Sequence, residues 1–239
     1  MKPTVPFSSL TVSFSLALAL VLALAAPVRA DRARLLVTSQ EAAEARVEMV
    51  LAARREVLAS SFIFGDDPFT MASMALLRDA ARRGLEVEVL VDAQWNKMPS
   101  AVLAHLLDEK IEIREFHPFR FDRLGWIFRR MHDKLLVTDG GAVIAGGRNV
   151  ESTYFGLGRQ IERNNYIDLD MQVEGEAARE ARAYFLRTWA SRHVRPIRAR
   201  ATDAEKRAAA EELDEHKLWL DQRIDDATND AGRPPRELS

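Results

Sequence analysis

The chain has 239 residues, of which 47% are hydrophobic, and its 34 basic and 36 acidic residues leave a formal net charge of −2. This length allows one sizeable domain with a buried core, and the near balance of charge gives no general attraction to nucleic acid. There is no cysteine, which excludes disulfides, thiol catalysis and thiolate metal sites.

The first thirty residues differ in character from the rest. Lys2 is the only charged residue before an apolar run, Phe14–Ala26, that is rich in Leu and Ala. The run is short for a membrane span, and Val28 and Ala30 suit signal-peptidase cleavage after Ala30. We therefore expect residues 1–30 to be a cleaved signal peptide of an exported protein, periplasmic or membrane-associated, with a retained anchor as the alternative.

From residue 40 onward, hydrophobic periodicity predicts helices and strands in alternation. The periodicity is helical over Gln40–Leu58. The elements that follow in chain order are a strand Val57–Phe64, a helix Met71–Arg83, a strand Leu85–Asp92, a helix Ser100–Lys110 and a strand Ile111–Phe116. Pro68 before the second helix fits a helix start, and Gly84 after it fits a C-cap. This alternation predicts an α/β fold.

A β-hairpin is the next predicted element. Its arms are Lys134–Asp139 and Ala142–Gly146, and they are joined by Gly140 and Gly141. Two glycines suit a tight turn because both central positions then tolerate positive φ.

Beyond the hairpin the sequence predicts a strand, Tyr166–Val173, and a helix, Glu176–Ala190. The chain then becomes charged and rich in alanine, which predicts a solvated helix over residues 201–226 and disorder at the end. We therefore expect one globular domain over residues 31–195 and a charged helical tail or linker, partly disordered, over 196–239.

The start of the hairpin carries the residues that best suit catalysis. Alternate residues of a strand share a face, so His132 and Lys134 should point together, and Asn149 should return beside them along the second arm. A neutral imidazole there can attack phosphorus while the ammonium and the carboxamide stabilise the charged oxygens. Gly146 and Gly147 would let the backbone approach the phosphate with free N–H groups.

The full pattern H-x-K-x4-D-x6-G-G-x-N, which starts at His132, resembles the HKD signature of the phospholipase D superfamily. An isolated His-x-Lys would be a strand histidine beside a solvated lysine, but the longer spacing is specific. The segments AARRGLEVEVLVDA, MHDKLLVTDGGAVIAGGRNVESTYFGLG and NNYIDLDMQV are especially similar to the N-terminal half of bacterial C-type cardiolipin synthases, over roughly Arg34–Trp189. The resemblance implies a phospholipase D-like domain with a mixed β-sheet flanked by helices.

The resemblance also implies a role for each residue of the pattern. His132 is the expected nucleophile, which forms a phosphohistidine intermediate. Lys134 and Asn149 are the expected phosphate-binding residues, together with the glycine pair. Asp139 is expected to fix the hairpin rather than to transfer protons.

The family orients its nucleophile with a carboxylate on a later strand. Asp168 stands where that carboxylate is expected, and Asp170 is the reserve candidate. A carboxylate bonded to one ring nitrogen sets the tautomer and leaves the other nitrogen able to attack. The alternative for Asp168 is an ordinary charge on an edge strand.

No metal or other cofactor is called for. Lys134, Asn149 and backbone amides would supply the positive field that a cation otherwise provides. The chain's 5 histidines are also too scattered for a recognisable metal-ligand spacing.

The active site of this family combines two such motifs, and this chain has one. The other histidines lack the residues that should follow them; they are His105, His117, His193 and His216. Two copies could therefore pair as a homodimer, or the chain could be the front half of a longer enzyme, or it could be an inactive relative.

The leading interpretation is hydrolysis of a phospholipid phosphodiester or transfer of its phosphatidyl group to an alcohol. Trp126, Ile127 and Phe128 would enter a membrane headgroup zone beside Arg129 and Arg130, although packing of this loop over the site is equally compatible with the pattern. The same aromatic and basic strip also fits a secreted nuclease, which the acidic net charge and the closer similarity to the synthases disfavour. The third interpretation is a binding module that does not turn over substrate.

Overall fold

A computed structural model describes residues 31–118, 128–156 and 165–231, with side chains up to residue 224. The expected signal peptide and the end of the tail beyond residue 231 lie outside these residues. Two of the expected membrane-contacting residues, Trp126 and Ile127, lie outside them as well.

An eight-stranded mixed sheet runs through the described unit. Its strands are β1 (Arg32–Leu36), β2 (Glu56–Ser61), β3 (Glu86–Asp92), β4 (Glu112–Phe116), β5 (Leu135–Thr138), β6 (Ala142–Gly146), β7 (Asp170–Glu174) and β8 (Val194–Pro196). Their order is β1-β7-β6-β5-β2-β3-β4-β8. The pairs β2–β3 and β3–β4 are parallel and the other pairs are antiparallel, which confirms the predicted mixed α/β fold.

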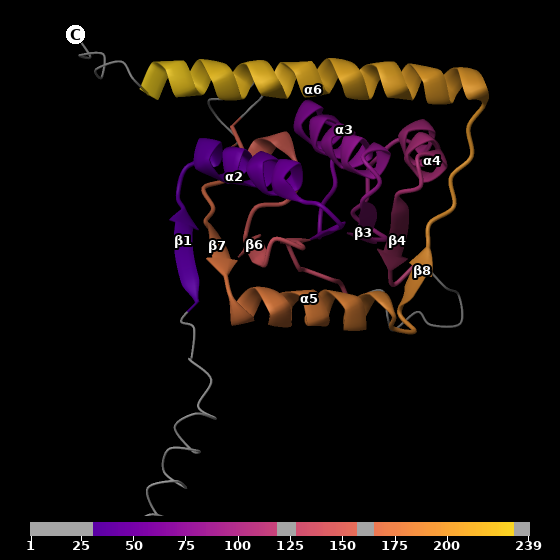
Figure 1. Cartoon of the computed structure of the whole chain (residues 1–239). Coiled ribbons are helices and arrows are strands. Elements are labelled where there is room, and N and C mark those ends of the chain that lie inside the picture. Colours follow the sequence, from indigo (N-terminus) through magenta and orange to yellow (C-terminus); the bar gives the residue numbers. More distant parts are fainter. Residues whose placement is uncertain (1–30, 119–127, 157–164, 232–239) are drawn as a thin grey trace, which may run out of the picture. The chain divides into compact units, whose positions relative to one another are not determined.

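Helices cover both faces of the sheet (Figure 1). One face carries α2 (Ser39–Ala52), α3 (Pro68–Arg82), α4 (Ser100–Asp108) and α6 (Asp203–Ala231), and the other carries α5 (Glu176–Trp189). A short 3-10 helix, η2 (Ser152–Tyr154), follows the hairpin. Within the described part of the chain, no helix combines the length and the apolar character needed to cross a bilayer.

The alternation of side chains along β2 shows how the sheet divides two cores. Val57 packs in the core under α2, α3 and α4, whereas Leu58 packs with Phe185 and Trp189 of α5. Successive strand residues point to opposite faces, so a strand buried on both sides is a continuous apolar run rather than an alternating pattern.

The first helix is shorter than its periodicity predicts. A capping box closes its start, because the Thr38 side chain accepts from the N–H of Glu41 and the Glu41 side chain accepts from the N–H of Thr38. It ends at Ala52, because Ala53 adopts an extended conformation with ψ of 143°. The chain needs this early stop to enter β2 at Glu56.

The tail helix is not a solvated linker over its described length. Leu213 and Leu220 of α6 are buried against the core beneath α3 and α4, while Leu218 is 62% exposed. Buried Arg78 of α3 donates to Asp214 of α6 at 2.5 Å. The apolar stripe that the sequence shows is therefore a packing face, and α6 forms one compact unit with the sheet (Figure 1).

Asp139 fixes the turn end of the β5–β6 hairpin. Its Oδ1 accepts from the backbone N–H of Arg54 at 3.0 Å and its Oδ2 accepts from Nε of Arg55 at 3.4 Å. Burial raises the pKa of Asp139, but the backbone N–H groups of Arg54, Arg55 and Glu56 outweigh burial, so that the pKa is lowered overall. Asp139 therefore ties the hairpin to the segment that leads into β2.

Replacing Asp139 with Asn should lower the free energy of unfolding at neutral pH by about 1–3 kcal/mol, because a charged acceptor of backbone N–H groups is lost. The folded-state pKa lies below the unfolded value, so the stabilisation is present above the unfolded pKa and is lost as pH falls through the folded pKa. Denaturant unfolding of wild type and Asp139→Asn should therefore converge in acid. Glu48→Gln, which changes an exposed carboxylate of α2, should show no such convergence.

Candidate active site

His132 and Lys134 lie together immediately before β5. Nζ of Lys134 is 3.3 Å from Nδ1 of His132 and donates to the carbonyl oxygen of His132 at 2.9 Å. Lys134 is 7% exposed, whereas His132 is open to solvent. The structure thus brings an accessible imidazole and a buried ammonium into direct contact, as their spacing predicts.

Asn149 lies on the other side of the end of β2. It is 2% exposed, and its Oδ1 accepts from the N–H of Ile63 at 3.0 Å and from Oγ of Ser61 at 3.3 Å. These two bonds occupy the carbonyl oxygen and orient the carboxamide, whose NH₂ group bonds to the hydroxyl of Tyr154.

Phe62 packs beside both His132 and Lys134. Its ring centroid is 4.8 Å from that of His132, and Nζ of Lys134 lies 5.5 Å from the same centroid. Trp95, from the loop after β3, packs on Phe62 at 5.4 Å and is 38% exposed. This aromatic wall was not predicted from the sequence. The pattern there predicts only a buried strand, and no short-range feature connects Phe62 or Trp95 with His132.

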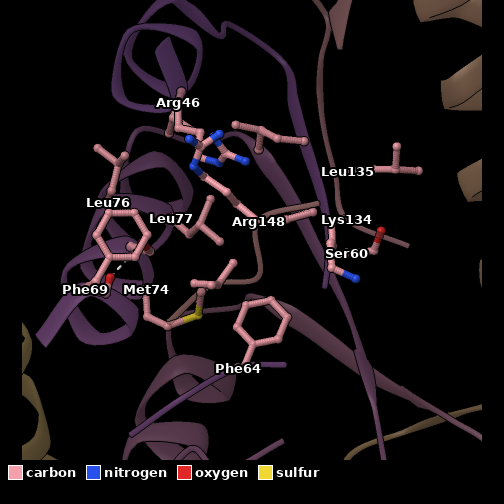
Figure 2. A pocket seen from close by; sticks show the side chains of 15 residues that line it. Arg46, Ser60, Phe64, Phe69, Met74, Leu76, Leu77, Lys134, Leu135 and Arg148 are labelled. Carbon is pink, nitrogen blue, oxygen red and sulfur yellow. Dashed lines mark hydrogen bonds between the residues drawn. The ribbon is translucent and has the colours of Figure 1, made fainter. Parts of the chain in front are cut away.

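A cavity of about 60 Å³ lies behind Lys134, between the sheet and the helices α2 and α3 (Figure 2). Apolar side chains such as Phe64 and Met74 form much of its wall, and the guanidinium groups of Arg46 and Arg148 meet at another side (Figure 2). Burial lowers the pKa of Lys134, against the opposing effect of Asp168 and more distant carboxylates. The ammonium is therefore held in a poorly hydrated place.

Gly146 and Gly147 make room for two carboxylates. A Cβ at Gly147 would lie 1.8 Å from Oδ1 of Asp168, and one at Gly146 would lie 2.1 Å from Oδ1 of Asp170. The expectation of free N–H groups here fails for Gly147, whose N–H donates to the carbonyl of Leu169 at 3.0 Å. The N–H of Gly147 is used because the segment after β6 pairs with the segment before β7.

The two candidate aspartates occupy different environments. Asp170 is buried and accepts from Nη2 of Arg46 at 2.9 Å and from Nη1 of Arg148 at 3.3 Å. Asp168 is half-buried, accepts from the N–H of Leu169 at 2.8 Å and lies close enough to Lys134 to raise its pKa. Asp170 is thus committed to an internal ion pair, while Asp168 acts electrostatically on Lys134 and has no hydrogen bond to the His132 imidazole.

The remaining predicted residues lie elsewhere. Asp139 is at the opposite end of β5 from Lys134, so it belongs to the hairpin support described above. His105 is buried in α4, and His117 packs on Phe116 and His193 beyond β4. Over the described ranges, no group of three or more His, Asp or Glu side chains is arranged to hold a metal ion.

The family is apparent from sequence comparison. A sequence model described as "Cardiolipin synthase, PLD-like domain" matches residues 47–189, more than half of the chain. Cardiolipin synthase C of Escherichia coli K12 is 33% identical over 171 residues, which are 66% of this chain and 35% of that protein. Cardiolipin synthase A of Pseudomonas syringae pv. syringae is 28% identical over 175 residues, 70% of this chain and 35% of that protein.

A solved structure agrees at the level of the fold. Phosphatidylserine synthase of Haemophilus influenzae superposes with a TM-score of 0.56 and 17% sequence identity, covering 80% of this chain and 44% of that chain. The chain spans about a third of the length of the curated relatives it matches, 35% for each of the two synthases. With the contact between His132 and Lys134 and the match over most of the sheet, the chain belongs to the cardiolipin synthase family of phospholipase D-like domains.

Proposed function

We propose that this chain supplies one catalytic half of a phospholipase D-type enzyme that acts on phospholipids. The reaction is hydrolysis of the phosphodiester or transfer of the phosphatidyl group to an alcohol. The observation that carries the proposal is the 3.3 Å contact between Nδ1 of His132 and Nζ of Lys134 at an accessible position. Membership of the cardiolipin synthase family supplies the substrate class.

In the first step Nε2 of His132 attacks the phosphorus and the bond to the leaving alcohol breaks, which leaves a phosphohistidine. Lys134 and the NH₂ group of Asn149 stabilise the negative charge on the non-bridging oxygens. The low hydration around Lys134 strengthens this attraction, because a charge interacts more strongly where water is scarce. In the second step water or an alcohol displaces the imidazole.

The tautomer of His132 decides whether Nε2 can attack. The Lys134 ammonium can donate a hydrogen bond to Nδ1 only when Nδ1 carries no proton. In the neutral ring the proton is then on Nε2. Attack by Nε2 requires the proton on Nδ1, and that tautomer is stabilised by an acceptor beside Nδ1. We assign this role to Asp168, which would replace the Lys134 ammonium at Nδ1 once that ammonium binds the phosphate, since Asp170 is held by Arg46 and Arg148.

A histidine of a second HKD motif has to protonate the leaving oxygen. We place that motif either on a second copy of this chain or on the second half of a longer enzyme. The surface beside Asp168 fits a protein partner, because Tyr166, Ile167 and Leu169 all expose large apolar side chains there. Export would place the site near a membrane, where the exposed ring of Phe128 suits the headgroup zone.

Trapping of the intermediate tests the proposal directly. Incubation with phosphatidylglycerol that carries a labelled phosphate should leave acid-labile label on the wild-type chain, detected by intact-protein mass spectrometry. His132→Ala should carry none, because the attacking nitrogen is gone, whereas His216→Ala on α6 should label normally. Equal labelling of wild type and His132→Ala would overturn the assignment, and label taken only from nucleic acid would favour the nuclease.

Gly147→Ala should slow formation of the phosphohistidine by about 10²-fold, because the new Cβ displaces the Asp168 carboxylate from its position. Quenched-flow labelling measures this rate, and circular dichroism checks the fold. Gly140→Ala is the matched control, since its Cβ would meet only Oγ1 of Thr138 at 3.6 Å. A normal rate in Gly147→Ala would remove Asp168 from the mechanism.

The alkaline limb of the labelling rate should reflect Lys134. Phosphate binding needs the ammonium form, which exists below the pKa, and burial lowers that pKa from the ordinary 10.5. As the pH is raised, the labelling rate should therefore begin to decline at a lower pH than it would if a surface lysine were titrating. Lys134→Arg keeps its charge, so its normalised profile should extend to higher pH; an unchanged limb would mean that another group titrates.

A further inference from the structure

A second cavity opens beside His132, on the face of the sheet that α5 covers. Its volume is about 400 Å³. One wall is the segment from Arg130 to Asp133, and the other is the second half of α5 with the residues that follow it. The nucleophile thus stands between this cavity and the one behind Lys134.

One face of α5 supplies polar groups to the cavity. Tyr184, Arg187 and Thr188 line it, and their spacing of three and four residues places them on one side of the helix, while Ser191 lines it from the segment just after α5. Arg187 is exposed and forms no ion pair with any residue that the structure describes. Its guanidinium therefore has donors to offer an anion.

Arg130 presents a second guanidinium from the opposite wall. Its Nη1 donates to Asp92 at 3.0 Å, its Nη2 to the carbonyl of His117 at 3.4 Å, and its Nε to the carbonyl of Arg129 at 3.2 Å. These bonds brace the group, so little conformational entropy is lost when its remaining N–H groups bind a ligand.

One carboxylate lines the cavity among the residues described for it. Asp133 accepts from the hydroxyl of Tyr184 at 2.6 Å, which occupies one of its oxygens. Since Asp92 already pairs with Arg130, Arg187 is the guanidinium of the lining that has no carboxylate partner among the described residues. The hydroxyl of Ser191 adds a neutral donor, whereas the hydroxyl of Thr188 is bonded to Tyr184. A cavity of this kind selects an anion with neighbouring hydroxyl groups, such as a glycerol phosphate.

We propose that this cavity binds the phosphate of the acceptor lipid during phosphatidyl transfer, with Arg187 and Arg130 as its ligands. The inference rests on the proposed function. In that step a glycerol hydroxyl of the acceptor forms a bond to phosphorus and the bond from phosphorus to Nε2 of His132 breaks. The electron pair returns to the imidazole, and the hydroxyl proton passes to the histidine of the second motif. The acceptor's own phosphate is then only a glycerol unit away from His132, within reach of a cavity that adjoins it.

Binding is tested first, on the full chain and without turnover. Glycerol 1-phosphate is titrated into protein labelled with nitrogen-15 in arginine, and the side-chain N–H signals are followed by NMR. Arg187→Gln should weaken binding at this cavity about tenfold or more, since a charge-assisted hydrogen bond is lost. Arg179→Gln is the matched control on the same helix, because Arg179 pairs with Glu176 away from this cavity. Equal affinity in wild type and Arg187→Gln would overturn the inference.

Transfer is tested second, by discharge of the labelled phosphohistidine. Short-chain phosphatidylglycerol and free glycerol are compared as acceptors, and the ratio of their discharge rates is measured. Arg187→Gln should lower this ratio about tenfold, since only the lipid acceptor carries the second phosphate. An unchanged ratio would overturn the acceptor assignment. Failure of the wild type to label at all would contradict the proposed function instead, while the titration still decides whether the cavity binds the anion.

Discussion

The antiparallel pairing of β5 with β2 is the constraint on which the site depends. Ser60 pairs with Leu135, so Lys134 enters the hairpin beside the end of β2. Ser61 then orients Asn149 and Phe62 contacts His132, so one strand end gathers groups from three segments. A shift of this register by one residue would move every side chain of β5 to the opposite face and separate the imidazole from the carboxamide.

The buried carboxylate of Asp170 complements this pairing. It pairs with Arg46 of α2 and with Arg148, which follows β6, and it occupies the space that a Cβ at Gly146 would need. Leaving any one of these charges unpaired in the interior would be strongly destabilising, so the three groups define a single arrangement of helix and hairpin. The same interaction distinguishes the two neighbouring carboxylates. Asp170 is held by the two arginines, whereas Asp168 remains near Lys134.

His132 stands at a boundary between two environments. Behind Lys134 lies a small cavity with a largely apolar wall, which keeps the ammonium poorly hydrated and would strengthen its attraction for a phosphate in the proposed reaction. Beside His132 lies a larger polar cavity with two guanidinium groups. A phospholipid combines both kinds of chemistry around one phosphorus, so an accessible imidazole between an apolar wall and a polar wall supports the substrate class that we propose.

Local pattern determined much of this protein. The buried strands, the Gly-Gly turn and the spacing from His132 to Asn149 are short-range features, because side-chain periodicity and turn chemistry act over a few residues. The edge strands β1 and β8, the docking of α6 and the pairing of Asp170 with Arg46 and Arg148 were decided only in the tertiary structure. Arg46 and Asp170 are 124 residues apart, and no periodicity encodes a contact between segments so distant. The aromatic wall of Phe62 and the use of the Gly147 N–H by Leu169 depend in the same way on which strands become neighbours.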